Sequence, residues 1–113
     1  MTVYADNAAT TQMSDSVLKA MMPLLTDIYG NPSSLHSVGQ IAKEHLEAAR
    51  ETVAECIGAD PKEIYFTSGG SEADNQAIRS AAYIGARKGK KHIISSKFEH
   101  HAVLHTLDAL KKE

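Results

Sequence analysis

The chain has 113 residues, 42% hydrophobic and 23% charged, with a formal net charge of -2; it is long enough for one small domain and has an ordinary globular balance. The weak net charge excludes a global electrostatic attraction to nucleic acid or to an anionic membrane, and the apolar stretches are too short to cross a bilayer. With a single cysteine, Cys56, and no basic leader ahead of an apolar segment, we expect a cytoplasmic chain without an intrachain disulfide.

Two elements are predicted at the N-terminal end. Val3–Ala5 is a short segment that favours a strand and precedes a polar turn. Next comes a helix: Ser14 or Asp15 can cap its N-terminus, and apolar residues recur at helical spacing as far as Ile28. Pro23 lies inside this helix, and we expect it to kink or split it, because proline removes a helical hydrogen bond.

A break and a long helix follow. Gly30–Ser34 is rich in turn-forming residues, so the chain should leave helical geometry there. From about Ser37 to Ile57, apolar residues again recur at helical spacing, and Gly58 supplies a stop signal. Cys56 lies near the end of this helix, and we interpret it as a small buried residue and not as a reactive thiol.

The remaining sequence alternates strands with helices. We expect a strand at Ile64–Thr67, a helix from about Ser71 to Lys88, a second strand at His92–Ser95 and a last helix that starts near His100. A strand, a crossover helix and a second strand form a βαβ unit, which predicts parallel strands and a right-handed crossover. The fold class is therefore α/β. Two or three strands do not complete such a sheet, so we expect the opening portion of a larger fold, with strand edges and apolar helix faces left uncovered unless another chain covers them.

The most distinctive segment is the turn between the predicted strand at Ile64–Thr67 and the helix after it. Ser68, Gly69, Gly70 and Ser71 combine two hydroxyl groups with two glycines at a predicted helix N-terminus. The free N–H groups of a first helical turn attract anions, and phosphate in particular. The segment matches neither the dinucleotide-binding fingerprint nor the P-loop. An ordinary helix-capping turn, with Ser71 as the cap, explains the same residues.

Four motifs, in order along the chain, resemble the N-terminal part of pyridoxal-phosphate-dependent cysteine desulfurases, which are class V aminotransferases. They are YADNAATT at Tyr4–Thr11, YGNPSS at Tyr29–Ser34 with His36, FTSGGSEADN at Phe66–Asn75, and SSKFEHHAVL at Ser95–Leu104. The NifS/IscS-like subgroup is the most similar, because the second and third motifs match its forms. The resemblance covers nearly the whole chain, and four ordered motifs are more specific than any one of them.

The resemblance implies the N-terminal portion of a fold type I transferase, with an incomplete parallel or mixed sheet flanked by helices, and a homo-oligomer, usually a homodimer. Residues 1–15 would belong to the small domain of that fold, and residues 16–113 would begin its large cofactor-binding domain. By position, Gly70 and Ser71 would bind the phosphate of pyridoxal 5'-phosphate. His100 would stack on the pyridine ring as a catalytic residue, since imidazole exchanges protons near neutral pH.

The implied reaction takes sulfur from L-cysteine to give L-alanine and an enzyme persulfide. The persulfide supplies Fe–S cluster assembly or tRNA thiolation through a sulfur-acceptor protein such as an Fe–S scaffold. The family's Schiff-base lysine and persulfide-forming cysteine lie beyond the matched region, and neither Lys97 nor Cys56 corresponds to them. We therefore expect the 113 residues alone to have no desulfurase activity. Whether they bind the cofactor by themselves is left open.

A second class of function is a non-catalytic interaction or metal-binding module that pairs with another chain. His101 and His105 are four residues apart on a predicted helix, a spacing that suits zinc or nickel. No further ligand is evident at a suitable spacing, and an exposed helix face also explains the pair. The basic run Arg87–Lys91 is explained by a solvated helix C-terminus, so we expect no nucleic-acid contact from this segment.

Overall fold

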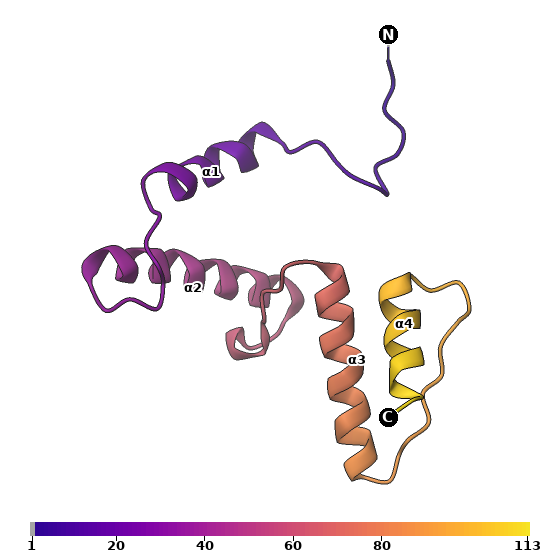
Figure 1. Ribbon diagram of the computed structural model, residues 1–113. Coiled ribbons are helices and arrows are strands. Elements are labelled where there is room, and N and C mark those ends of the chain that lie inside the picture. The colour runs from indigo at the N-terminus through magenta and orange to yellow at the C-terminus, as the bar shows by residue number, and fades with distance from the viewer. Residues whose placement is uncertain (1) are drawn as a thin grey trace. The chain divides into compact units, whose positions relative to one another are not determined.

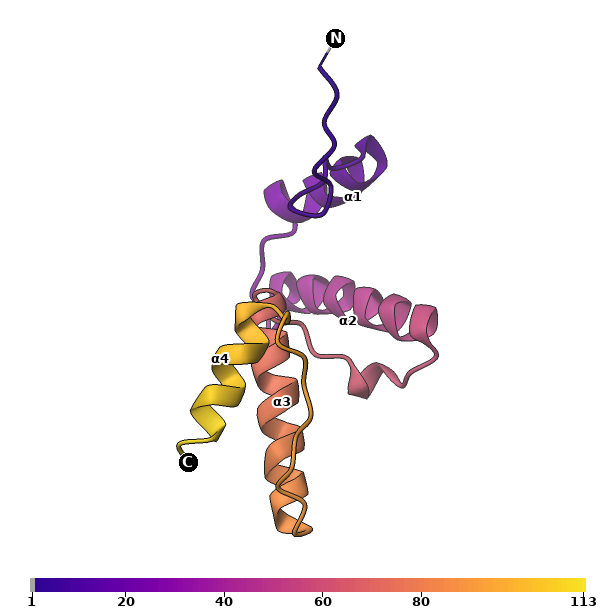
Figure 2. The same cartoon turned by 90° about the vertical axis from the view of Figure 1, so that its right-hand side faces the viewer.

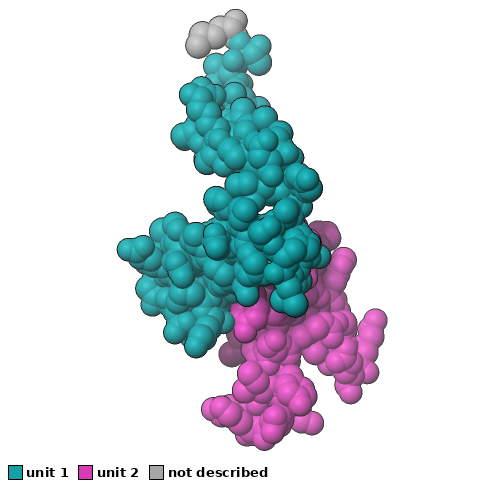
Figure 3. Space-filling view, turned by 90° about the vertical axis from the view of Figure 1, so that its left-hand side faces the viewer, with its two compact units in different colours: residues 1–64 teal, residues 65–113 magenta. Residues whose placement is uncertain are grey.

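The computed structural model describes residues 2–113, and helices are its only regular elements over that range (Figure 1). In chain order they are α1 (Asp15–Thr26), α2 (Ser37–Ile57), the short 3₁₀ helix η1 (Pro61–Glu63), α3 (Gly70–Arg87) and α4 (His101–Leu110). The chain divides into two compact units, Met1–Ile64 and Tyr65–Glu113, which Figure 3 colours separately. None of the helices between residues 2 and 113 has both the length and the apolar character needed to cross a bilayer.

Helix α1 begins where the sequence predicts. The Ser14 hydroxyl accepts a hydrogen bond from the Val17 N–H at 3.4 Å, which confirms Ser14 as the N-cap. Of the two outcomes expected at Pro23, the split is wrong, because the helix continues through it to Thr26, and the kink stays a prediction. A proline removes one helical hydrogen bond, and here its carbonyl accepts from the N–H groups of both Asp27 and Ile28, which ends the helix two residues before the predicted boundary.

Helix α2 has the predicted bounds, Ser37–Ile57, and Gly58 ends it in the left-handed conformation with φ of 67°. Its first turn is capped by His36, whose Nδ1 accepts from the Gly39 N–H at 3.3 Å. Gly39 is buried against the turn that precedes the helix. A Cβ there would lie 2.6 Å from the Asn31 carbonyl oxygen, so only glycine allows this close approach.

The second half of α2 packs against η1 within the same unit. The Arg50 guanidinium donates to the Ile64 carbonyl and also pairs with Glu47 at 3.2 Å, which connects the helix to the end of the unit. Cys56 is exposed, so its prediction as a buried residue is wrong. The buried side of α2 falls on smaller residues, notably Ala42 and Ala54, and Cys56 lies outside that narrow contact.

In the second unit, α3 and α4 lie side by side, as Figures 1 and 2 both show. Thr106 of α4 is 2% exposed and its hydroxyl donates to Asn75 Oδ1 of α3 at 2.6 Å. Arg79, in the middle of α3, forms an ion pair of 3.0 Å with Glu113, which lies three residues after the end of α4. These polar contacts hold two helices whose shared apolar contact is small, since no residue of α3 is buried.

The three predicted strands are not confirmed, because no residue from 2 to 113 forms a strand. Val3–Ala5, Ile64–Thr67 and His92–Ser95 are non-helical, and Ile64 has extended backbone geometry with φ of -92° and ψ of 122°. A strand is defined by the hydrogen bonds that it shares with a neighbour, and the described segments form no such ladder. The helices of the predicted α/β fold are therefore observed, and its sheet stays a prediction.

Candidate functional site

The N-terminus of α3 is formed by the serine- and glycine-rich turn. The N-cap is Gly69, and no side chain caps this end, whereas Ser14, His36 and His100 cap the other three α-helices between residues 2 and 113. Ser71 therefore lies inside the first turn and is not the cap, which removes the capping explanation for it. The N–H groups of an uncapped first turn keep their hydrogen-bonding capacity and their partial positive charge for an anion.

Glu72 fixes the shape of this turn. Its carboxylate accepts from the Ser68 hydroxyl at 2.6 Å and from the Ser68 N–H at 2.7 Å. These two bonds, the hydroxyl first, lower the pKa of Glu72 below its ordinary value. Sequence reasoning missed this residue, because Ser68 and Glu72 are four apart and the usual capping-box spacing is three.

The backbone of the turn is open to solvent at both glycines. A Cβ added at Gly69 or at Gly70 would meet no heavy atom within 4 Å. Gly69 has a φ of 163°, which is extended geometry that any residue adopts. The glycines are therefore not required by packing or by a left-handed conformation here. What they provide is unobstructed access to the backbone N–H groups of the first turn.

His100 is the N-cap of α4. Its Nδ1 accepts a hydrogen bond from the Ala102 N–H at 3.1 Å. An acceptor nitrogen carries no proton, so neutral His100 has its proton on Nε2, and that N–H group is free to act as a donor. The capping role was not predicted from the sequence, although a histidine directly before a helical run could have suggested it.

A cavity of about 320 Å³ lies between the first turns of α3 and α4. The side chains that line it and carry polar groups are Ser71, Asn75, Arg79, His100, His101, His105 and Thr106. The structure thus brings together two of the three predicted site residues, Ser71 and His100, although 29 positions separate them in the numbering. Gly70 does not line the cavity, but it precedes Ser71 at the start of α3.

Comparison with known proteins now identifies the family. Residues 3–113 match the family described as aminotransferase class-V. The chain belongs to this family. It is 51% identical over 104 residues to a protein named cysteine desulfurase IscS from Methanosarcina thermophila, an alignment that covers 92% of this chain and 26% of the relative. A protein of the same name from Clostridium botulinum (strain Hall) is 50% identical over 111 residues, which cover 98% of this chain and 28% of the relative.

Two solved structures are similar in backbone to this chain. A protein described as NifS-like superposes with a TM-score of 0.88 at 40% identity, over 99% of this chain and 30% of that one. A structure described as SspA in complex with cysteine superposes with a TM-score of 0.86 at 40% identity, over 98% of this chain and 32% of the other. The chain therefore spans less than a third of the length of these relatives, and it has the fold of a portion of a NifS-like enzyme.

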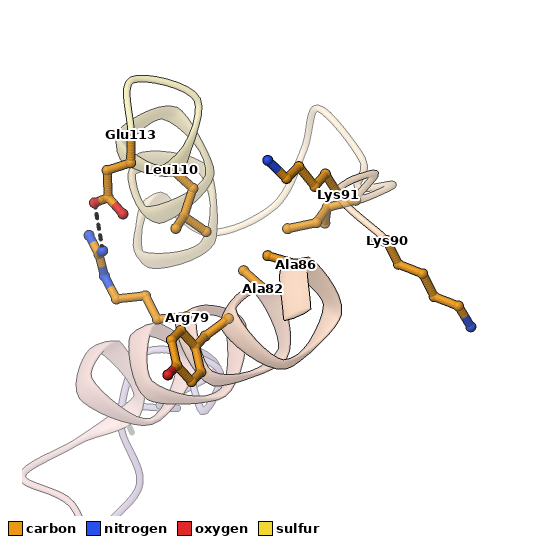
Figure 4. A pocket seen from close by; sticks show the side chains of 9 residues that line it. Arg79, Ala82, Ala86, Lys90, Lys91, Leu110 and Glu113 are labelled. Carbon is orange, nitrogen blue, oxygen red and sulfur yellow. Dashed lines mark hydrogen bonds and ion pairs between the residues drawn. The ribbon is translucent and has the colours of Figure 1, made fainter. Parts of the chain in front are cut away.

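A second and larger cavity in this class-V chain, of about 490 Å³, lies at the other end of the α3–α4 pair (Figure 4). Ala82 and Ala86 of α3 and Leu110 of α4 form its apolar side, and the Arg79–Glu113 ion pair closes one edge. None of the predicted site residues lines it. Size alone therefore does not mark the site, and the smaller cavity is the one that contains predicted chemistry.

The alternative metal site has two close histidines. The rings of His101 and His105 lie 5.4 Å apart, centroid to centroid, and both residues are exposed. Between residues 2 and 113, no group of three His, Cys, Asp or Glu residues has a geometry that could hold a metal ion. Lys97 is exposed and lies in a turn before α4.

Proposed function

We propose that these 113 residues are the portion of a cysteine desulfurase that holds the phosphate and one ring face of pyridoxal 5'-phosphate. One observation carries the proposal: Ser71, in the uncapped first turn of α3, lines the same cavity as His100, the cap of α4. Support also comes from relatives at about 50% identity that are named cysteine desulfurases.

The residues fit the phosphate end of this cofactor. A phosphate dianion needs several N–H or O–H donors and a positive local potential, and an uncapped helix N-terminus supplies both. At Gly70, no side chain obstructs approach to the backbone. In the proposal, the N–H groups of Gly70 and Ser71 donate to phosphate oxygens, and the Ser71 hydroxyl adds one more hydrogen bond. Threonine would supply the same hydroxyl at this position.

His100 contacts the cofactor ring in this proposal. The imidazole is fixed by its cap to Ala102 through Nδ1, so its face and its Nε2–H are presented to a ligand. A ring held in this way orients the pyridine ring, and its Nε2–H can donate a hydrogen bond when the cofactor is bound. Bound pyridoxal phosphate itself supplies the electron sink that the reaction needs.

The wider activity belongs to the proposal too. The complete enzyme would convert L-cysteine into L-alanine and an enzyme persulfide, pass sulfur to an acceptor such as an Fe–S scaffold or to tRNA thiolation, and work as a cytoplasmic homo-oligomer. A structure described as a complex with cysteine is among the solved relatives. Residues 1–15 would form part of the small domain, and residues 16–113 would begin the large domain. The 113 residues alone would release neither alanine nor sulfide.

A chimera tests the proposal. The matched 104 residues of the Methanosarcina thermophila relative would be replaced by their counterparts from this chain, and the product would be assayed for alanine and sulfide formed from L-cysteine. We expect turnover by the chimera and a marked loss when it also carries Ser71→Ala. A folded chimera that binds the cofactor with the same affinity whether residue 71 is serine or alanine would contradict the proposed phosphate site.

A further inference from the structure

Asn75 ends the FTSGGSEADN motif, and neither the phosphate site nor the ring contact uses it. Its side chain makes two hydrogen bonds in opposite directions. Nδ2 donates to the Ser71 carbonyl at 2.8 Å, and Oδ1 accepts from the Thr106 hydroxyl at 2.6 Å. The first bond stays within α3, and the second crosses to α4. One amide group therefore joins the turn that contains Ser71 to the helix that His100 caps.

The atoms on each side determine how the amide is oriented. The Ser71 carbonyl can only accept, so the group that faces it must be the NH₂ of Asn75. Oδ1 then faces Thr106, whose hydroxyl carries the only proton that can lie between two oxygens 2.6 Å apart. The same hydroxyl also lies 2.7 Å from the Ala102 carbonyl, one turn earlier in α4. The proton is therefore shared between a bond within α4 and a bond to α3.

The link is shielded from water on the α4 side. Thr106 is 2% exposed and is the only buried residue of α4. A buried hydroxyl cannot replace its partner with water, so losing the hydrogen bond of Thr106 would cost free energy. Asn75, Thr106, Ser71 and His100 all line the same cavity. The bond thus lies in the wall of the proposed site and not at a distant point of the helix pair.

We propose that Asn75 is a positioning residue, which fixes the separation of Ser71 and His100 across the cavity through its paired hydrogen bonds to the Ser71 carbonyl and the Thr106 hydroxyl. This role rests on the proposed function of the cavity. Without the bridge, the ion pair between Arg79 of α3 and Glu113, which follows α4, is still present. The first turns then move relative to each other, and a ligand that needs both Ser71 and His100 binds less well.

Five variants of the isotope-labelled chain separate positioning from general stability. Asn75→Ala removes both bonds, and Thr106→Val removes only the hydroxyl while keeping nearly the same volume. Thr106→Ser restores the hydroxyl. Asn75→Asp keeps an acceptor for Thr106 but cannot donate to the Ser71 carbonyl. Glu113→Gln is the matched control, because it weakens the other polar contact between α3 and the end of the chain, at a residue that does not itself line the cavity although its partner Arg79 does.

The first readout is geometric and needs no cofactor. Nuclear Overhauser effects between the His100 ring and residues of α3 around the cavity are expected in the wild type, Thr106→Ser and Glu113→Gln. They should weaken or vanish in Asn75→Ala and Thr106→Val, with helical circular dichroism preserved; Asn75→Asp should keep the bond to Thr106 but loosen the α3 turn. Wild-type intensities in Asn75→Ala, or an equal weakening in Glu113→Gln, would overturn the positioning role.

The second readout uses the same variants in the chimera and measures its affinity for pyridoxal 5'-phosphate, titrated by ³¹P NMR. Thr106→Val should bind about tenfold more weakly than the wild type, the size expected when one buried hydrogen bond is removed. Asn75→Ala, which removes both bonds, should bind at least as weakly, and Thr106→Ser should restore binding. An unchanged affinity in Asn75→Ala, despite a displaced His100 ring, would overturn the inference. A chimera with serine at position 71 and asparagine at position 75 that binds no cofactor counts against the proposed function, while the Overhauser effects of the His100 ring still decide whether Asn75 positions it.

Discussion

Gly39 provides the sharpest test of how the first unit is packed. It is the third residue of α2 and is buried against the turn that precedes the helix. In a Gly39→Ala variant, the new Cβ would lie 2.6 Å from the Asn31 carbonyl oxygen and from Ser34 Cβ, and 2.7 Å from the Ser34 carbonyl oxygen. Ordinary contact begins at 3.4 Å, so the turn and the helix would have to separate by about 0.8 Å.

Two effects of opposite sign set the size of the change. Alanine favours a helix interior over glycine by about 1 kcal/mol. Overpacking a tight contact costs about 1–3 kcal/mol. We expect the cost at Gly39 to lie at the upper end of that range, because none of the three atoms that the new Cβ would meet is at the end of a flexible side chain. We therefore expect a net loss of about 2 kcal/mol in the free energy of unfolding, which is about a 30-fold change in the folded to unfolded ratio.

The assay is urea unfolding followed by residue-resolved NMR, with signals from the two units recorded separately. Gly70→Ala is the matched comparison, because it is also a glycine in the first turns of a helix and its added Cβ would meet nothing within 4 Å. Gly39→Ala should lower the midpoint for the first unit, and Gly70→Ala should leave the midpoint for the second unchanged or raise it slightly. Equal stabilisation by both substitutions would refute the close contact between the turn and α2.

Three further predictions concern the second unit. Ser71→Ala in the chimera should weaken pyridoxal 5'-phosphate binding by about 10- to 100-fold, since a hydrogen bond to a charged group contributes about 1.5–3 kcal/mol. Ser71→Thr should restore binding, and equal affinities with serine, alanine and threonine would count against a role for the hydroxyl. Because bonding to Ser68 lowers the pKa of folded Glu72, its stabilising contribution is complete above the unfolded value of about 4.3 and is lost as pH falls through the lower folded pKa. Urea midpoints between about pH 6 and about pH 2 should show this loss in the wild type and not in Glu72→Gln; parallel curves would contradict the bonding. His100→Ala should destabilise the start of α4 by about 1 kcal/mol, measured as faster hydrogen exchange of the Ala102 amide, while His100→Asn keeps a cap; no difference between these two variants would argue against capping.

Local patterns predicted the helices well. Ser14 as an N-cap and Gly58 as a left-handed stop are signals that lie within a few residues of the boundary they set, and both are confirmed. The strands at Ile64–Thr67 and His92–Ser95 depend on partners elsewhere, so their apolar patterns alone could not establish pairing. The side chain of Ile94 is 87% exposed, whereas pairing in a sheet would place a neighbouring strand beside it.

In the candidate site, too, residues in local motifs could be predicted from the sequence and long-range contacts could not. Gly70, Ser71 and His100 are predicted as site residues because they lie in motifs that carry the family resemblance. The bond between Asn75 and Thr106 joins residues 31 positions apart, and no local pattern encodes such a contact. Cys56 was misjudged for a related reason, since helical spacing gives the side of α2 on which it lies but not what covers that side.

The position of the phosphorus atom tests the central claim most directly. A crystal structure of the chimera loaded with pyridoxal 5'-phosphate should place the phosphate within hydrogen-bonding distance of the Ser71 hydroxyl and the Gly70 and Ser71 N–H groups, with the His100 ring against the pyridine ring. A phosphate bound elsewhere on the protein, away from the start of α3, would contradict the account.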